Sequence, residues 1–393
     1  MPKTRVLYLI SSLAQGGAER HLVDLARSLD GERWLPEICV RSARVHYKTD
    51  VPAGQPRYRL DSPVWASPAA FSRLVGTIRS FRPHIVHAYM NDANLWARLA
   101  VRAAGHPRPR VVTSVHLDDM PAAYRWLEPR LARWSDRIIA HSVSIERFLV
   151  GALGVPASLV AMIPNGVDEQ QFRPPTEDER QRARAARGFA ADQLIALMPA
   201  RIASQKNQDL VVEGLGALKA AGELPASFRL LLAGRVSSGS YERRVRAAIA
   251  RHRLADEVRF LGAVSEMRDL YAAADVVLMP SQTEASPIAA LEALACGLPV
   301  LISAAANTDD VVRPGEHGWQ IGAASASTIA DGLRTILRSA PAERRRMGNA
   351  GRQHVLQKFT RQRVIGDFER LYAELTDDPP AATAGKRGTG VRP

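Results

Sequence analysis

Two acidic side chains stand eight positions apart in an otherwise small, apolar stretch, TEASPIAALEALACGLPV, residues 283–300. Ser286 is a favourable N-cap and Pro287 suits the first helical position, so the sequence predicts a helix that begins there. Glu284 then lies on the loop before the helix and Glu292 on its second turn, roughly 10 Å apart along the axis. That separation is too long for one metal ion and suits a ligand with two hydroxyl-bearing parts. Two solvated surface acids are the alternative.

Two basic side chains stand five positions apart in PARIASQKNQDL, after the apolar run LIALM. The guanidinium of Arg201 and the ammonium of Lys206 can converge on one phosphate group from a strand-to-helix loop. The N–H groups around Ile288 and Ala289, at the start of the predicted helix, offer a second anion-binding element. The two glutamates would then meet hydroxyl groups on either side of a bound diphosphate, which is the shape of a nucleotide-sugar. A solvated basic pair is the alternative.

A glycine pair and a histidine also follow predicted strands. Gly16 and Gly17 come between RVLYLI and a helical pattern, where their backbone can approach a ligand, unless they form an ordinary tight turn. The spacing is not GxGxxG, which argues against NAD. His116 follows RVVTSV and could bind a sugar hydroxyl or carry a proton near neutral pH, unless it is structural. Asp118 and Asp119 are adjacent and have no evident third ligand, so we predict no metal site.

Length and composition indicate a folded protein of two domains. A chain of 393 residues exceeds one ordinary core, and two domains of roughly 170 to 190 residues are expected. The hydrophobic content of 46% and charged content of 24% are typical of globular proteins. Cys39 and Cys296 provide neither a disulfide framework nor a thiolate metal site, which favours a reducing, cytoplasmic setting.

The net charge of +13 points to anionic partners, among which lipid headgroups, phosphorylated ligands and nucleic acid stay open. Nucleic-acid binding is disfavoured because no strand shows interleaved aromatic and basic residues. The first apolar run is short and leads into the glycine pair, so it is predicted to be a strand and not a signal peptide. No apolar stretch approaches the roughly 20 residues that span a bilayer. We expect a cytoplasmic protein, either soluble or peripheral on the inner face of the membrane.

Short apolar runs alternate with helical patterns along the whole chain. The runs are RVLYLI, EICV, HIVHA, RVVTSV, RIIAHS and VAMIP, and then LIALMPA, FRLLLAG, EVRFLG, DVVLMP and LPVLIS. Near-continuous apolar strands separated by helices indicate parallel sheets covered on both faces. The sequence therefore predicts an α/β fold with two Rossmann-like domains. Ligands of such sheets bind beyond the carboxyl ends of the strands, here in a cleft between the domains.

The break between the domains is predicted in PNGVDEQQFRPPTEDERQ, where proline and charge replace the alternation. Residues 1–168 would form the first domain and residues 169–357 the second. The end of the chain, residues 377–393, has the composition of a disordered tail.

Several motifs occur in the order typical of one enzyme family. They are GGAERHLVDLA, VTSVH, RIIAHS, IPNGVDEQQFRP, ARIASQKNQDLVVEGL, VRFLGAVSEMRDLYAAADVVLMPS and TEASPIAALEALACGLPV. From about residue 5 to 372 the chain resembles the GT4 glycosyltransferases, retaining enzymes of the GT-B fold. The resemblance implies transfer of a hexosyl group from a nucleotide-diphosphate donor, a UDP- or GDP-sugar, to an acceptor hydroxyl, without a metal or other cofactor. The acceptor would be a glycan or glycolipid, such as a lipid-linked or polysaccharide precursor of the cell envelope.

The resemblance also implies a role for each candidate residue. Arg201 and Lys206 match the pair that holds the donor diphosphate, together with the backbone at Ile288 and Ala289. Glu292 matches the acid that hydrogen-bonds the ribose.

Four further positions match the two ends of the donor. Glu284 matches the acid at the donor-sugar hydroxyls, and Val264 matches the position beside the nucleobase. Gly16 and Gly17 match the loop that closes over phosphate and acceptor. The histidine after RVVTSV, His116, matches one near the donor sugar.

A final helix, about 358–376, is expected to cross back to the first, acceptor-binding domain, as in relatives of this kind. The sequence departs from the family pattern in four places. Ala285 replaces a common glycine, and Pro287 lacks an N–H. Residues 306–310, ANTDD, replace a Gly-Gly-x-x-Glu run, and Tyr89 stands where a second histidine is frequent.

The acceptor side has one candidate surface. Residues 121–134, PAAYRWLEPRLARW, combine aromatic and aliphatic side chains with three arginines, which could rest on an anionic membrane. A core-facing amphipathic helix with exposed arginines is the alternative. Two other functions stay open. A nucleotide-sugar 2-epimerase of the same architecture would turn over UDP-GlcNAc without an acceptor, and a non-enzymatic nucleic-acid binder would show steep salt dependence.

Overall fold

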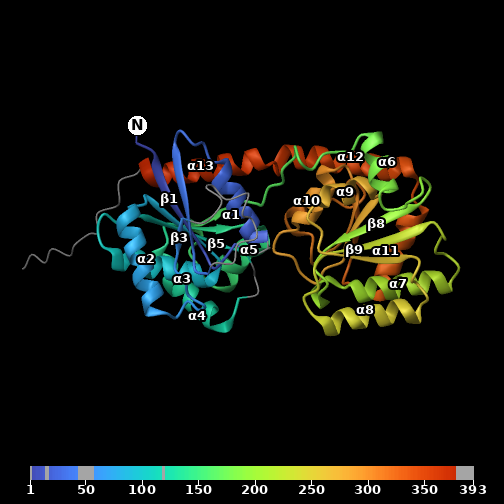
Figure 1. Ribbon diagram of the computed structural model, residues 1–393, viewed down its shortest axis with the longest axis horizontal. Helices are drawn as coiled ribbons and strands as arrows, with labels where there is room; N and C mark the ends of the chain where they lie inside the picture. The colour runs from blue at the N-terminus through green and yellow to red at the C-terminus, as the bar shows by residue number, and fades with distance from the viewer. Residues whose placement is uncertain (1, 14–16, 43–56, 117–119, 378–393) are drawn as a thin grey trace, which may run out of the picture.

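The computed structural model describes residues 2–13, 17–42, 57–116 and 120–377. They form two lobes that lie side by side, each built on one parallel sheet with helices on both faces (Figure 1). The predicted α/β fold with two parallel sheets is therefore confirmed. The predicted tail lies outside the described residues, except for Asp377, which ends the last helix.

The first sheet has seven strands in the order β3-β2-β1-β4-β5-β6-β7. Their bounds are Thr4–Ile10 (β1), Trp34–Val40 (β2), Tyr58–Arg59 (β3), Ile85–Tyr89 (β4), Arg110–Val115 (β5), Arg137–Ala140 (β6) and Val160–Met162 (β7). The second sheet has six strands in the order β10-β9-β8-β11-β12-β13. Their bounds are Leu194–Pro199 (β8), Phe228–Ala233 (β9), Val258–Gly262 (β10), Val276–Met279 (β11), Val300–Ser303 (β12) and Gly318–Ile321 (β13).

Every predicted apolar run contains a strand, and two strands at sheet edges escaped prediction. Strand β3 has only two residues, and β13, with the sequence GWQI, is too short and too polar to read as a buried strand. In both sheets the strand order reverses beside the first strand, so the loops after β1 and β8 open at a switch point.

Helices cover both faces of each sheet and fill the gaps between strands. Their bounds in the first lobe are Gly17–Ser28 (α1), Pro68–Phe81 (α2), Asn91–Ala104 (α3), Ala122–Leu131 (α4) and Val143–Arg147 (α5). In the second they are Glu177–Ala185 (α6), Gln208–Ala220 (α7), Gly239–Arg251 (α8), Met267–Ala273 (α9), Ile288–Ala295 (α10), Ala326–Arg338 (α11) and Pro341–Lys358 (α12), followed by Arg361–Asp377 (α13). Among the described helices none is both long and apolar enough to span a bilayer.

Helices α12 and α13 form a bent rod across the top of both lobes (Figure 1). The crossing helix expected at about residues 358–376 is α13, which begins slightly later, at Arg361. Helix α12 ends at Lys358 on the second lobe, and α13 begins at Arg361 on the first. The break leaves Phe359 and Thr360 outside both helices. There this passage of the chain between the lobes pairs with the earlier passage, at Val167.

The last helix is part of the core of the first lobe. It packs with α1 on one face of the first sheet, while α2 and α3 cover the other face. The hydroxyl of Tyr372 lies 2.6 Å from Nδ1 of His87 and 3.2 Å from the hydroxyl of Tyr8, all three being fully buried. Buried polar groups need such partners, so these bonds fix the helix in one register.

The chain passes between the lobes twice, and the two passages bond to each other. The N–H of Val167 donates to the carbonyl of Phe359 at 2.9 Å, and the N–H of Arg361 donates to the carbonyl of Val167 at 2.8 Å. Gly166 makes the close approach possible. A Cβ there would lie 3.0 Å from a methyl of Val364 and 3.2 Å from the carbonyl oxygen of Thr360.

We expect Gly166→Ala to destabilise the protein by about 1–3 kcal/mol, because the added methyl overpacks the crossing. Gly366→Ala is the matched control. It lies in the interior of α13 with nothing within 4 Å of its Cβ position, so alanine should stabilise it by about 0.5–1 kcal/mol. Urea unfolding of each variant measures whether its free energy of unfolding falls or rises relative to the wild-type chain. Equal midpoints for Gly166→Ala and the wild-type chain would contradict the tight crossing.

Candidate functional site

Lys206 lies where the loops after β8 and β11 meet. Its ammonium forms an ion pair with the carboxylate of Glu284, and both side chains are about 14% exposed or less. The hydroxyl of Ser281 donates to the same carboxylate at 2.7 Å. The side-chain amide of Asn207 donates to the carbonyl of Pro280 at 2.7 Å, which ties the two loops together. The structure thus brings the predicted phosphate-binding lysine and the predicted sugar-binding glutamate into direct contact.

Arg201 lies on the same loop edge, on an exposed stretch. Its carbonyl accepts a hydrogen bond from the side chain of Gln208 at 2.8 Å, and its Nη1 donates to the hydroxyl of Ser237 at 3.3 Å. Its bonded partners therefore differ from those of Lys206. The predicted convergence of both cations on one point is not visible in their contacts, although they share one edge of the sheet.

The start of α10 differs from the sequence prediction. Pro287 occupies the N-cap position, and Ser286 makes no side-chain cap. With φ −82° and ψ 68°, Pro287 forms an inverse γ-turn in which the N–H of Ile288 donates to the carbonyl of Ser286 at 2.9 Å. Of the two predicted backbone donors, the N–H of Ile288 is thus occupied. Only that of Ala289 has no partner within the described residues.

Glu292 lies on the second turn of α10, as predicted, and its carboxyl is partly buried at the wall between the lobes. The hydroxyl of Tyr271 donates to its Oε2 at 2.7 Å. Burial raises the pKa of Glu292 to about 7, while the bond from Tyr271 and the charge of Arg20 oppose that rise. Glu292 is therefore a carboxyl poised between its neutral and ionised forms near neutral pH.

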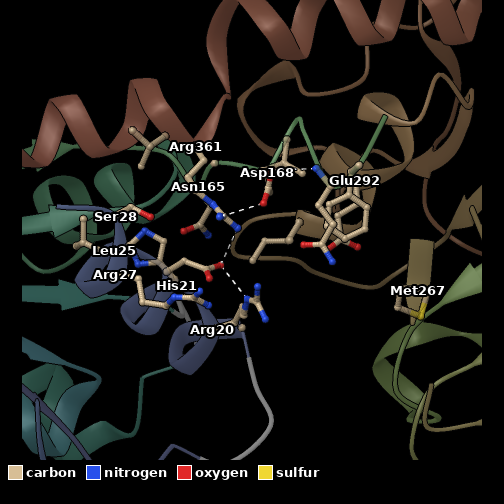
Figure 2. A pocket seen from close by; sticks show the side chains of 18 of the residues that line it. Arg20, His21, Leu25, Arg27, Ser28, Asn165, Asp168, Met267, Glu292 and Arg361 are labelled. Carbon is tan, nitrogen blue, oxygen red and sulfur yellow. Dashed lines mark hydrogen bonds and ion pairs between the residues drawn. The ribbon is translucent and has the colours of Figure 1, made fainter. Parts of the chain in front are cut away.

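A cavity of about 920 Å³ lies between the two lobes (Figure 2). Its wall is formed by Val264, Glu292 and Ile288 on the side of the second lobe and by Gly17 on the side of the first. The loop residues Ser265, Glu266 and Met267 continue the wall beside Val264. Three predicted donor-binding positions thus share one cavity with the start of α1, whereas Glu284, Arg201 and Lys206 do not line it.

An ionic network closes the hinge side of this cavity (Figure 2). Arg361 pairs with Asp168 at 3.0 Å and with Asp24 at 3.5 Å, and Asp24 also pairs with Arg20 at 2.8 Å. The network joins α1, the first crossing and α13. Sequence analysis missed these residues, although Asp168 lies in the IPNGVD motif and could have been considered.

The start of α1 faces the start of α10 across the cleft. A Cβ at Gly17 would lie 3.6 Å from the Cδ1 of Ile288. Gly16, the other half of the predicted glycine pair, lies outside the described residues. The one described glycine of the pair therefore begins α1 and faces the second lobe.

His116 belongs to a stack of aromatic rings in the first lobe. Its ring centroid lies 4.2 Å from that of His141 and 5.3 Å from that of Tyr89, both in stacked geometry. Burial holds the pKa of His116 well below its usual range, and the neighbouring histidines lower it further. Burial likewise lowers the pKa of His141 to about 4.

The predicted proton-carrying role of His116 is therefore not supported, because both imidazoles are neutral at neutral pH. The Nε2 atoms of His116 and His141 are buried without a hydrogen-bond partner. A neutral His116 can still give or accept a hydrogen bond, which was the other prediction for it.

The lobes also touch on the side away from the crossing. Asp309, with a left-handed φ of 60°, accepts a hydrogen bond from the N–H of Val143 at 2.6 Å through its Oδ1. Val143 is the first residue of α5, so the carboxylate meets the positive end of a short helix. The departure at residues 306–310 thus supplies a contact between the lobes.

Comparison with known proteins identifies the family of the chain. The family model described as Glycosyltransferase Family 4 matches residues 15–171, and the one described as Glycosyl transferases group 1 matches residues 179–354. The putative glycosyltransferase EpsF of Bacillus subtilis is 30% identical over 76% of this chain and 79% of that protein. The D-inositol 3-phosphate glycosyltransferase of Geodermatophilus obscurus is 28% identical over 79% of this chain and 65% of that protein.

Solved structures agree on the fold. The Anabaena protein HepE, in complex with UDP and glucose, superposes with a TM-score of 0.83 at 20% identity, covering 94% of this chain and 100% of HepE. A glycosyltransferase from Rickettsia africae has a TM-score of 0.83 at 19% identity, covering 96% and 100%. The chain therefore belongs to the GT4 family and is a glycosyltransferase of the GT-B fold.

Proposed function

We propose that this chain transfers a hexosyl group from a UDP- or GDP-sugar to an acceptor hydroxyl, with retention at the anomeric carbon. The observation that carries the proposal is the set of groups that the second lobe places after its strands and on α10. Val264 and the partly buried Glu292 line the cavity, and the Lys206 and Glu284 pair lies on the loops after β8 and β11. The complex of HepE with UDP and glucose supports a nucleotide-sugar donor.

In this proposal the donor lies along these groups. The base contacts Val264, and the ribose hydroxyls bond to Glu292. The diphosphate lies near Arg201 and Lys206 and accepts from the N–H of Ala289. The sugar then reaches Glu284, which is the order that the resemblance implied.

The Lys206 and Glu284 pair places one positive and one negative side chain beside the proposed donor. A sugar hydroxyl can donate to Glu284, while the ammonium of Lys206 and the guanidinium of Arg201 stabilise the negative charge of the leaving diphosphate. The bond from the anomeric carbon to the phosphate oxygen breaks as the bond to the acceptor oxygen forms on the same face. The acceptor proton passes to the departing phosphate oxygen.

We also propose that these cations act without a metal ion or other cofactor. Within the described ranges, no group of three or more His, Cys, Asp or Glu side chains is arranged to hold a metal. The His116 side chain would serve beside the sugar as a neutral hydrogen-bonding group, and Gly16 and Gly17 would close over the phosphates.

The acceptor is proposed to be a lipid-linked or polysaccharide precursor of the cell envelope, at the cytoplasmic face of a membrane. The supporting surface is on α4, where Trp126 is 59% exposed and the guanidinium of Arg130 lies 4.0 Å from its ring. Arg125 and Arg133 are exposed beside it. An aromatic ring among arginines is suited to the headgroup region of an anionic bilayer.

The first test of the donor site compares two lysines that each pair with a glutamate. Lys206→Met should weaken binding of UDP or GDP about tenfold or more, because the diphosphate loses a charged partner. Lys219→Met removes the Lys219–Glu257 pair on the far side of the lobe and should leave binding unchanged. Thermal shifts with UDP, GDP, ADP and their sugars measure both, since ligand at about 100 times its Kd adds roughly 2.7 kcal/mol.

An assay of turnover separates the enzyme classes. Release of UDP or GDP that requires an added acceptor supports a transferase, whereas conversion of UDP-GlcNAc without an acceptor would establish an epimerase instead. Equal losses of binding in both lysine variants would refute the role given to Lys206.

A second prediction concerns the pH dependence of stability. Because burial raises the pKa of Glu292 to about 7, its ionisation in the folded state costs free energy, and this cost grows from its ordinary pKa up to pH 7. Glu292→Gln removes the cost, so above pH 7 it should increase the free energy of unfolding by at most about 3 kcal/mol, seen as a higher Tm, and it should leave Tm unchanged below pH 4.5. The same variant should bind the nucleotide more weakly.

Glu179→Gln is a control of opposite sign. The bond with Arg173 lowers the pKa of Glu179 to about 2, so its ionised form stabilises the fold at neutral pH. Glutamine there should lower Tm at pH 7, with a loss that shrinks as the pH falls toward 2. A Tm gain for Glu292→Gln that is the same at pH 4.5 and pH 8 would contradict a raised carboxyl pKa.

A third prediction tests the α4 surface. The wild-type chain should sediment with phosphatidylglycerol vesicles at low salt and not with phosphatidylcholine vesicles. Trp126→Ala and Arg130→Gln should each reduce binding several-fold, consistent with about 1 kcal/mol per basic residue. Arg338→Gln, an exposed arginine of α11, is the control. No binding of the wild-type chain to phosphatidylglycerol would end the membrane proposal.

A further inference from the structure

The loops after β8 and β9 continue side by side beyond the end of the sheet. The N–H of Ala200 donates to the carbonyl of Ala233 at 2.9 Å, and that of Ile202 donates to the carbonyl of Arg235 at 3.0 Å. Ile202 and Val236 form a parallel bridge. The two strands of this sheet therefore carry their pairing into the loop edge where the donor is proposed to bind.

Gly234 allows this close approach. A Cβ at that position would lie 2.1 Å from the carbonyl oxygen of Ala200 and 2.9 Å from the backbone nitrogen of Arg201. No other residue type fits without moving one of the two loops. The glycine thus brings the backbone before Arg235 against the backbone of Arg201.

Two arginines become neighbours as a result. Arg201 and Arg235 each precede one partner of the bridge, so their α carbons lie about 5 Å apart, the spacing of adjacent strands. Both residues are exposed. Within the described residues neither forms an ion pair, and the side chain of Arg201 donates only to the uncharged hydroxyl of Ser237. Two adjacent guanidinium groups repel each other and favour a bound anion.

Lys206 differs from this pair because it already has an anionic partner in Glu284. A diphosphate that reaches the loop edge therefore meets one lysine that is already paired with a carboxylate and two arginines that form no direct ion pair among the described residues. Guanidinium groups bind phosphate oxygens in a bidentate manner, which makes them better suited to the diphosphate than a lysine that is shared with a carboxylate.

The first lobe contributes one acid that acts on Arg235. Glu19, in the first turn of α1, is partly buried, and the charge of Arg235 lowers its pKa against the rise that burial causes. The start of α1 faces the second lobe, because a Cβ at Gly17 would lie 3.6 Å from the Cδ1 of Ile288. The Glu19 carboxyl and the Arg235 guanidinium thus interact across the cleft.

We propose that Arg235 binds the donor diphosphate together with Arg201, and that Glu19 is the counter-charge that the diphosphate replaces. This inference rests on the proposed donor site and adds a residue that sequence analysis did not select. It assigns an opposing role to an acid of the other lobe. Removal of the Arg235 guanidinium should weaken binding of the diphosphate, and removal of the Glu19 acid should strengthen that binding.

The test measures binding of UDP or GDP, whichever the thermal panel selects, and of its nucleoside by calorimetry with the full chain. Arg235→Gln should raise the Kd of the diphosphate about tenfold and leave that of the nucleoside unchanged. Glu19→Gln should lower the diphosphate Kd several-fold. In the double variant the gain from Glu19→Gln should shrink, because its partner is gone.

Arg229→Gln is the matched control, since Arg229 lies at the opposite end of the same strand, β9. Its diphosphate Kd should equal that of the wild-type chain. If Lys206→Met loses binding while Arg235→Gln does not, the donor site stands and the role of Arg235 is refuted. If Arg235→Gln weakens the nucleoside and the diphosphate equally, the effect is structural and the inference also fails. A wild-type chain that binds no nucleoside diphosphate would overturn the proposed function itself.

Discussion

The backbone pair at Val167 is the constraint on which the site depends. Its N–H and its carbonyl both bond to the second crossing, at Phe359 and Arg361. The chain must pass between the lobes twice, because α13 completes the core of the first lobe after the second is finished. Bonding the two passages to each other fixes the distance between the lobes. The cavity is built directly on them, since residues 165–168 and Arg361 line its hinge side.

The polar groups of the site are held at a cost that a ligand can offset. Burial raises the pKa of the Glu292 carboxyl to about 7, although the hydroxyl of Tyr271 donates to it. Arg201 and Arg235 are neighbouring like charges, and the Nε2 of His116 is buried without a partner. By contrast, the buried Arg98 forms a bidentate pair with Glu128 at 2.8 and 2.6 Å. A bound polar ligand would give the site the partners that its own side chains do not supply.

The sequence predicted the parts of the fold that depend on local pattern. Apolar runs of four to seven residues gave the central strands, because buried parallel strands need no alternation. Long-range features behaved differently. The N-cap at Ser286 failed because the γ-turn at Pro287 moves the helix start. The proton-carrying role of His116 stays a prediction, and the sequence could not show the rings of His141 and Tyr89 that stack on it, because both residues are distant in sequence. Arg235 was overlooked because an arginine in the polar run RVSSGSYERR has no local signal, and only the contact of Gly234 with Ala200 reveals its neighbour.

The contacts between the lobes are unequal, and this inequality determines how they can separate. At the crossing, two backbone hydrogen bonds, the tight contacts of Gly166 and the pairs of Arg361 act together. On the far side, the bond between Asp309 and Val143 is a single charged hydrogen bond, held by a residue in a left-handed conformation. Left-handed conformations of non-glycine residues cost about 1 kcal/mol or more, which offsets part of what that bond contributes. The interactions at the crossing therefore outnumber this hydrogen bond, and the inequality favours opening of the lobes about the crossing over sliding of one lobe past the other.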